Sequence, residues 1–162
     1  MTVLHLMVGL PCSGKSTRAK QLEAELGALR LTPDEWHIEL FGDDVADPDH
    51  DRRHDAVEAL MWRVASAVLA KGVDVILDFG FWARVEREDF AARAAALGAA
   101  TKIHFMDVPR DELLVRLARR NAEAPEHAFI IPESDLLGWL ARFEPPTADE
   151  LATIAAAGSQ HQ

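Results

Sequence analysis

The chain has 162 residues, of which 49% are hydrophobic and 27% are charged, a composition typical of one globular domain and not of a disordered chain. The 17 Lys and Arg residues against 27 Asp and Glu residues give a formal net charge of −10, which argues against general binding of nucleic acid or an anionic membrane. The single cysteine, Cys12, excludes an intrachain disulfide. Without an evident signal peptide or membrane-spanning stretch, we expect a cytoplasmic protein.

Short apolar runs alternate with amphipathic segments along the chain. Strands are predicted over residues 3–8, 28–31, 73–77 and 101–106. Helices are predicted over residues 16–26, 35–41, 50–71 and 84–97, then from Pro109, from Pro132 and once more after Pro146. This alternation predicts an α/β fold with a parallel sheet covered by helices on both faces. We expect one domain over residues 1–157 and a disordered tail over residues 158–162.

The clearest motif is GLPCSGKST over residues 9–17, which matches G-x-x-x-x-G-K-[ST] between a predicted strand and a predicted helix. Glycines let such a loop wrap tightly, so that backbone N–H groups and the positive end of the helix converge on phosphate oxygens. Lys15 then reaches the β- and γ-phosphates, and the Ser16 hydroxyl ligates Mg²⁺. The predicted nucleotide contacts in the loop are Gly9, Pro11, Cys12, Ser13, Gly14, Lys15, Ser16 and Thr17. The chain contains no N-K-x-D motif, which favours ATP over GTP.

Two acidic residues lie near the ends of predicted strands. Asp34 follows the second strand and would approach the γ-phosphate, where its carboxylate can accept a proton from an attacking hydroxyl; it is equally suited to cap a helix. Asp78 closes an apolar strand, which is the pattern of an acid that holds Mg²⁺ or its water. Three arginines, Arg116, Arg119 and Arg120, are candidates for binding phosphate, or form a solvated basic face.

These pieces occur in an order that resembles the bacterial P-loop kinases of the "AAA-domain" ATP-binding type. They also resemble the kinase domain of phage polynucleotide kinase and, more distantly, the zeta toxins. The matching segments are GLPCSGKST (9–17), LTPDEW (31–36), VILDFGFW (75–82) and DVPRDELLVRLARRN (107–121). The resemblance implies a P-loop sandwich with strand order 2-3-1-4-5 and a lid over about 116–135. It also implies that Asp34 is the catalytic base, that Asp78 is the acid of the third strand, and that Arg116 and Arg120 contact ATP phosphates.

The sequence departs from the polynucleotide kinases at two positions. His37 stands where they tend to carry an arginine, and Phe79 stands where they have a small polar residue. Phe79, Phe81 and Trp82, with Trp36, suggest instead an aromatic pocket for a small acceptor, to which Asp34 and His37 would also belong, although ordinary core packing would explain the aromatic side chains as well. The seven histidines give no convincing metal set, and His50 and His54, four residues apart, are expected at the exposed start of a helix.

The sequence therefore predicts a phosphotransferase, a monomer or a homodimer, that moves the γ-phosphate of ATP·Mg²⁺ to a hydroxyl of a small molecule. Two alternatives remain open at this point. One is a kinase for polynucleotide 5′-hydroxyl ends, and the other is an ATP-binding switch or ATPase.

Overall fold

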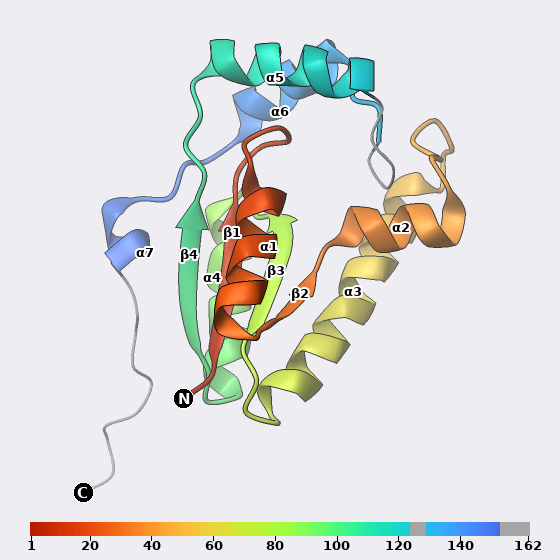
Figure 1. Ribbon diagram of the computed structural model, residues 1–162. Helices are drawn as coiled ribbons and strands as arrows, with labels where there is room; N and C mark the ends of the chain where they lie inside the picture. The colour runs from red at the N-terminus through yellow and green to blue at the C-terminus, as the bar shows by residue number, and fades with distance from the viewer. Residues whose placement is uncertain (124–128, 153–162) are drawn as a thin grey trace, which may run out of the picture.

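The computed structural model describes residues 1–123 and 129–152, which form one parallel sheet and the helices around it (Figure 1). The strands are β1 (Val3–Val8), β2 (Leu29–Leu31), β3 (Val75–Gly80) and β4 (Ala100–Phe105), in the order β2-β3-β1-β4. The helices are α1 (Lys15–Leu26), α2 (Pro33–Phe41), α3 (His50–Leu69), α4 (Arg84–Ala96), α5 (Arg110–Glu123), α6 (Glu133–Arg142) and α7 (Ala148–Ala152). The predicted α/β sandwich is confirmed.

Helices cover both faces of this sheet, as the alternation along the chain predicts. Successive side chains of a strand point to opposite faces. Leu6 of β1 therefore joins the large core under α3 and α4, while its neighbour Met7 packs with Ala19 and Leu22 of α1 on the other face (Figure 1). Because both faces of β1 and β3 are buried, these strands are apolar runs, and only their carboxyl ends are free to carry functional side chains.

Helices α5 and α6, which we call the lid helices, lie beyond the carboxyl ends of the strands and above the loop that joins β1 to α1 (Figure 1). They have a hydrophobic core of their own. Leu113 and Leu117 of α5 pack there against Leu136 of α6, with Ile131 and Leu10 completing the buried cluster. The lid helices are thus held to the phosphate-binding loop through Leu10.

The predicted fifth strand is wrong for the residues that the structure describes. The sheet ends at β4, whose neighbour on that side is α7 and not a strand. The connection from α6 to α7 contains Pro145 and Pro146, which have no N–H group to donate to a ladder along β4. The strand order of the other four agrees with the prediction. The tail predicted over 158–162, and with it the domain end at residue 157, lie outside the described residues.

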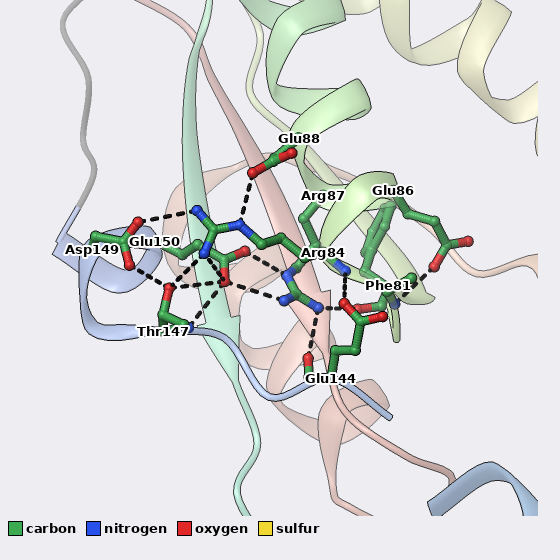
Figure 2. Close-up of polar contacts among 10 residues, drawn as sticks. Phe81, Arg84, Glu86, Arg87, Glu88, Glu144, Thr147, Asp149 and Glu150 are labelled. Carbon is green, nitrogen blue, oxygen red and sulfur yellow. Dashed lines mark hydrogen bonds and ion pairs between the residues drawn. The ribbon is translucent and has the colours of Figure 1, made fainter. Parts of the chain in front are cut away.

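The segment that holds α7 is fixed to α4 by two arginines (Figure 2). Arg87 is 2% exposed; it donates from Nε and Nη2 to the Glu150 carboxylate at 2.7 and 3.2 Å, and from Nη1 to the carbonyls of Phe81 and Glu144, both at 3.0 Å. Arg84 lies closer to solvent and pairs with Glu88 and Asp149. The buried guanidinium therefore ties the C-terminal segment to the end of β3, beside the site described next.

Within the described part of the chain, no helix is both long and apolar enough to cross a membrane.

Candidate functional site

The loop from Gly9 to Gly14 has the backbone shape of a phosphate cradle. Its first N–H, from Gly9, donates to the Gly80 carbonyl at 3.0 Å and so anchors the loop to the end of β3. Cys12 and Gly14 have φ of 67° and 87°, left-handed values that turn the chain into α1. A Cβ at Gly9 would lie 2.6 Å from the Ser13 hydroxyl oxygen, so the glycine allows the loop to close on itself. No side chain caps α1, which leaves the N–H groups of its first turn available to an anion.

Asp78 lies at the centre of the polar contacts below this loop. Its Oδ2 accepts hydrogen bonds from the Ser16 hydroxyl at 2.6 Å and the Thr32 hydroxyl at 3.1 Å. Its Oδ1 is buried, accepts no hydrogen bond, and lies 3.6 Å from Lys15 Nζ. A hydroxyl and a carboxylate with a free buried oxygen are the ligands that Mg²⁺ prefers, so Ser16 and Asp78 fit the predicted metal site. Asp78 lies inside β3, which runs to Gly80 and not to Leu77 as predicted.

The arginines of α5 divide between the loop and solvent. Arg116 donates from Nη1 to the Cys12 carbonyl at 3.3 Å and pairs with Glu112. Arg120, one turn further along α5, is half-buried and its charge acts on the Cys12 thiol, whereas Arg119 is exposed on the flank of the helix. Burial raises the pKa of Cys12 above its usual value, although Arg120, Lys15 and Arg116 act to lower it, so the thiol is not an activated nucleophile.

A cavity of about 450 Å³ opens beside the loop and brings Asp34 together with Lys15, Ser16 and Asp78. Phe79, Phe81 and Trp82, which the sequence suggests for an acceptor pocket, line it as well. The Trp82 indole N–H donates to the Gly9 carbonyl at 3.2 Å, which fixes the ring at the edge of the loop. Two further aromatic residues, Phe129 and Trp139, belong to the apolar part of the wall. No sequence pattern pointed to Phe129 or Trp139, because they come from the lid helices and the segment between them.

Two predicted acceptor residues lie elsewhere. Trp36 and His37 are not among the residues that line this cavity. Trp36 packs against the large core, and His37 is fully buried beneath α3. Trp36 follows Asp34 by two residues on α2, and a rotation of about 100° per residue turns its side chain to the opposite side of the helix. His37 follows Asp34 by three residues and lies on the same side, but its ring packs against His50 and His54 of α3 and does not line the cavity.

His37 instead belongs to a group of side chains that the sequence analysis missed, which we call the histidine cluster: His37, His50, His54 and Asp44. Asp44 accepts hydrogen bonds from His37 Nε2 and His50 Nδ1, both at 2.6 Å, and from Arg53 at 2.8 Å. Burial acts to raise the pKa of Asp44, but these three hydrogen bonds outweigh it and hold the pKa well below its usual range. The prediction that His50 and His54 are exposed is therefore wrong, since both pack against His37.

His54 connects this cluster to Asp34. Its Nδ1 lies 3.3 Å from His37 Nδ1, and its Nε2 lies 3.5 Å from Glu58 and 3.9 Å from Asp34. Burial acts to lower the pKa of His54, but the hydrogen bond with Glu58 and the charges of Asp34 and Asp55 raise it above its ordinary value. The Asp34 side chain itself is 46% exposed, so its carboxylate is open to the cavity.

The nucleotide-cradling loop, the buried Asp78 and the parallel sheet define a P-loop protein. A family model described as "AAA domain" matches residues 4–146, and the chain belongs to that family. Comparison with curated proteins found no match by sequence.

Several solved structures share this fold. Kti12 of Chaetomium thermophilum, in complex with ADP-AlF3, superimposes with a TM-score of 0.70 at 19% identity, over 97% of this chain and 86% of that one. A sugar kinase of Janibacter sp. HTCC2649 has a TM-score of 0.66 at 21% identity, over 93% and 82% of the two chains. A chain of the Pnkp1/Rnl/Hen1 RNA repair complex has a TM-score of 0.68 at 23% identity, over 87% of this chain but only 43% of that one.

Proposed function

We propose that the protein is an ATP-dependent phosphotransferase that moves the γ-phosphate to a hydroxyl of a small, uncharged or cationic acceptor. The observation that carries the proposal is that Asp34 shares one cavity with Lys15 and Ser16. A nucleotide switch needs the phosphate-binding loop alone. A kinase also needs room for an acceptor between the loop and a base, and a cavity of about 450 Å³ offers that room.

The residues around the cavity suit in-line transfer. The loop amides and Lys15 would hold the β- and γ-phosphates, while Arg116 and Arg120 would approach them from α5. Asp34 would accept the proton of the acceptor hydroxyl as its oxygen bonds to the γ-phosphorus and the bond from that phosphorus to the bridging oxygen of ADP breaks. Mg²⁺, held by Ser16 and Asp78, would neutralise phosphate charge.

The charges lining the cavity support a small acceptor that is not a polyanion. Lys15 is the one Lys or Arg among the described residues of the wall. Acidic residues are more numerous: besides Asp34 and Asp78, the wall contains Asp51, Glu58, Glu86 and Asp135. A nucleic acid end would bring its phosphates against these carboxylates, whereas a sugar, an amino alcohol or an amino sugar would find hydrogen-bond acceptors and aromatic faces.

The experiment is transfer of ³²P from γ-labelled ATP to a set of hydroxyl compounds, with 5′-hydroxyl oligonucleotides as a separate arm. We expect transfer to one class of neutral or cationic small molecule. Asp34→Asn should lower transfer by about 10²–10⁴-fold, as loss of a general base does, with ATP binding retained. Asp43→Asn is the matched control, because Asp43 is exposed on the neighbouring loop and does not line the cavity.

Two results would contradict the proposal. Transfer to oligonucleotides in preference to every small molecule, with binding that weakens steeply in salt, would make the protein a polynucleotide kinase. Hydrolysis of ATP that no acceptor accelerates, and that Asp34→Asn leaves unchanged, would make it an ATPase or a switch.

A further inference from the structure

We propose that His37, Asp44 and His50 form a binding site for a divalent transition metal of the Zn²⁺ type, separate from the Mg²⁺ and ATP site. The three residues come from the body of α2, the loop after it and the first residue of α3. Their ligand atoms, one from each side chain, all lie within 4.8 Å of one another. Two imidazoles and a carboxylate are a common ligand set for Zn²⁺, and imidazole nitrogen disfavours the harder Mg²⁺.

The distances leave a short step to a metal complex. His37 Nε2 and His50 Nδ1 both point at the same oxygen, Asp44 Oδ1, from 2.6 Å. Donor atoms of a tetrahedral zinc site lie about 3.4 Å apart, because each bond to the metal is about 2.1 Å long. The two distances of 2.6 Å would therefore have to lengthen by less than about 1 Å for the ion to fit between the carboxylate and the rings.

The surroundings resemble the outer contacts that orient metal ligands. Arg53 donates to the second oxygen of Asp44 at 2.8 Å, which leaves Oδ1 to bind a cation through one oxygen. The charge of Arg53 is shared with Asp47, at 3.1 Å. His37 Nδ1 lies 3.3 Å from His54 Nδ1, so a His37 bound to a metal through Nε2 can donate its Nδ1 proton to a neutral His54 that carries its own proton on Nε2, facing Glu58.

Burial favours specific binding over surface adsorption. The side chains of His37, Asp44 and His50 are 0%, 9% and 17% exposed. The ring of Phe129 packs nearly at right angles against both imidazoles, with ring centroids 5.5 and 5.3 Å away. His50 also lines the cavity and provides the route by which an ion reaches the site. Once bound, the ion would join α2 to α3 across the loop that contains Val45, another residue of the cavity wall.

The test uses the full chain without a polyhistidine tag, stripped with EDTA and titrated with Zn²⁺ by calorimetry and with Co²⁺ by visible absorption. We expect one saturable equivalent of Zn²⁺, a four-coordinate Co²⁺ spectrum, and a rise in the unfolding temperature on adding Zn²⁺. His50→Gln and Asp44→Asn should each weaken the metal by at least about tenfold, the least that removing even an outer partner costs.

The matched control is His104→Gln, because His104 pairs with His5 on the opposite face of the sheet and offers the alternative histidine site. It should bind Zn²⁺ as the unmodified protein does. The proposal is overturned if the unmodified protein shows no saturable equivalent, if His50→Gln and Asp44→Asn bind normally, or if His104→Gln abolishes binding. Should either cluster variant fail to fold without metal, the Co²⁺ spectrum of the unmodified protein decides: a six-coordinate spectrum refutes the site.

Discussion

Replacing Arg87 by methionine tests whether the buried guanidinium holds the C-terminal segment to the sheet. The change removes four hydrogen bonds, two to the Glu150 carboxylate and two to the carbonyls of Phe81 and Glu144. The Arg87 and Glu150 side chains are 1% and 8% exposed, so the substitution leaves a carboxylate charge without its cation in a poorly solvated place. Breaking such a pair costs about 3–5 kcal/mol. Glu150 keeps hydrogen bonds from Thr147, so we expect about 3 kcal/mol, near the lower end of that range.

The assay is urea denaturation followed by circular dichroism, with Arg84→Met as the matched control. Arg84 is 42% exposed and pairs with the same segment through Asp149, so water screens that pair and its loss should cost clearly less than the loss of Arg87. Replacing both Arg87 and Glu150 by methionine should recover much of the stability, since no charge is then left alone. Equal losses for Arg84→Met and Arg87→Met would refute the reasoning.

The pH dependence of Arg87→Met gives a second check. The Arg87 hydrogen bonds hold the pKa of Glu150 below its usual value. The stability contributed by the pair is therefore present above the pKa of an unfolded glutamate and is lost as the pH falls through the lower, folded value. The difference between Arg87→Met and the unmodified protein should narrow in acid.

Three further predictions concern other parts of the molecule. Lys15→Ala should weaken ATP binding by at least about tenfold, measured by calorimetry, because a charge-assisted hydrogen bond contributes about 1.5–3 kcal/mol; unchanged affinity would remove Lys15 from the nucleotide site. Gly80→Ala should lower the free energy of unfolding, measured in urea, by about 1–2 kcal/mol, because Gly80 has a φ of 97° and an added Cβ would lie 3.0 Å from the Trp82 indole nitrogen. Gly138→Ala is the control: an added Cβ would meet open space in α6, so this change should be neutral or stabilising. Burial, with the charges of His5, Lys102 and Arg18, lowers the pKa of His104 to about 4. The unfolded chain therefore binds a proton at this residue before the folded protein does, so the free energy of unfolding should fall by about 1–2 kcal/mol as the pH drops from about 6.5 to 4. His104→Gln should reduce this dependence on pH.

Local sequence patterns predict the features that depend on contiguous residues. The strand over residues 3–8, the loop over residues 9–14 and the start of α1 follow each other directly, so one motif contains the geometry of the cradle. Asp78 could be placed near the loop because parallel strands end at the same edge of the sheet. The order of the first four strands followed from the family resemblance and agrees with the structure.

The histidine cluster could not be predicted in this way. His37 and His50 are thirteen positions apart, and they meet only because the chain between α2 and α3 folds back so that Asp44 reaches both rings. Nothing in the spacing of His50 and His54 signals a buried third imidazole. The sequence also does not predict which side of α2 faces the cavity. This helix has nine residues, and its apolar and polar residues are not separated onto two sides, so the sequence pattern does not indicate which side is buried.

The separate core of the lid helices has a consequence for local unfolding. Leu113, Leu117 and Leu136 bury their surface against one another and against Leu10, while the sheet packs with α3 and α4 in the large core and with α1 in a second cluster. Phe143 packs against both cores and so connects them. Opening of the lid helices therefore exposes only the smaller cluster, and amide protons of α5 and α6 should exchange with solvent at a lower free energy of opening than those of β1 and β3. The helices that cover the phosphate-binding loop can thus open locally while the large core under the sheet stays folded.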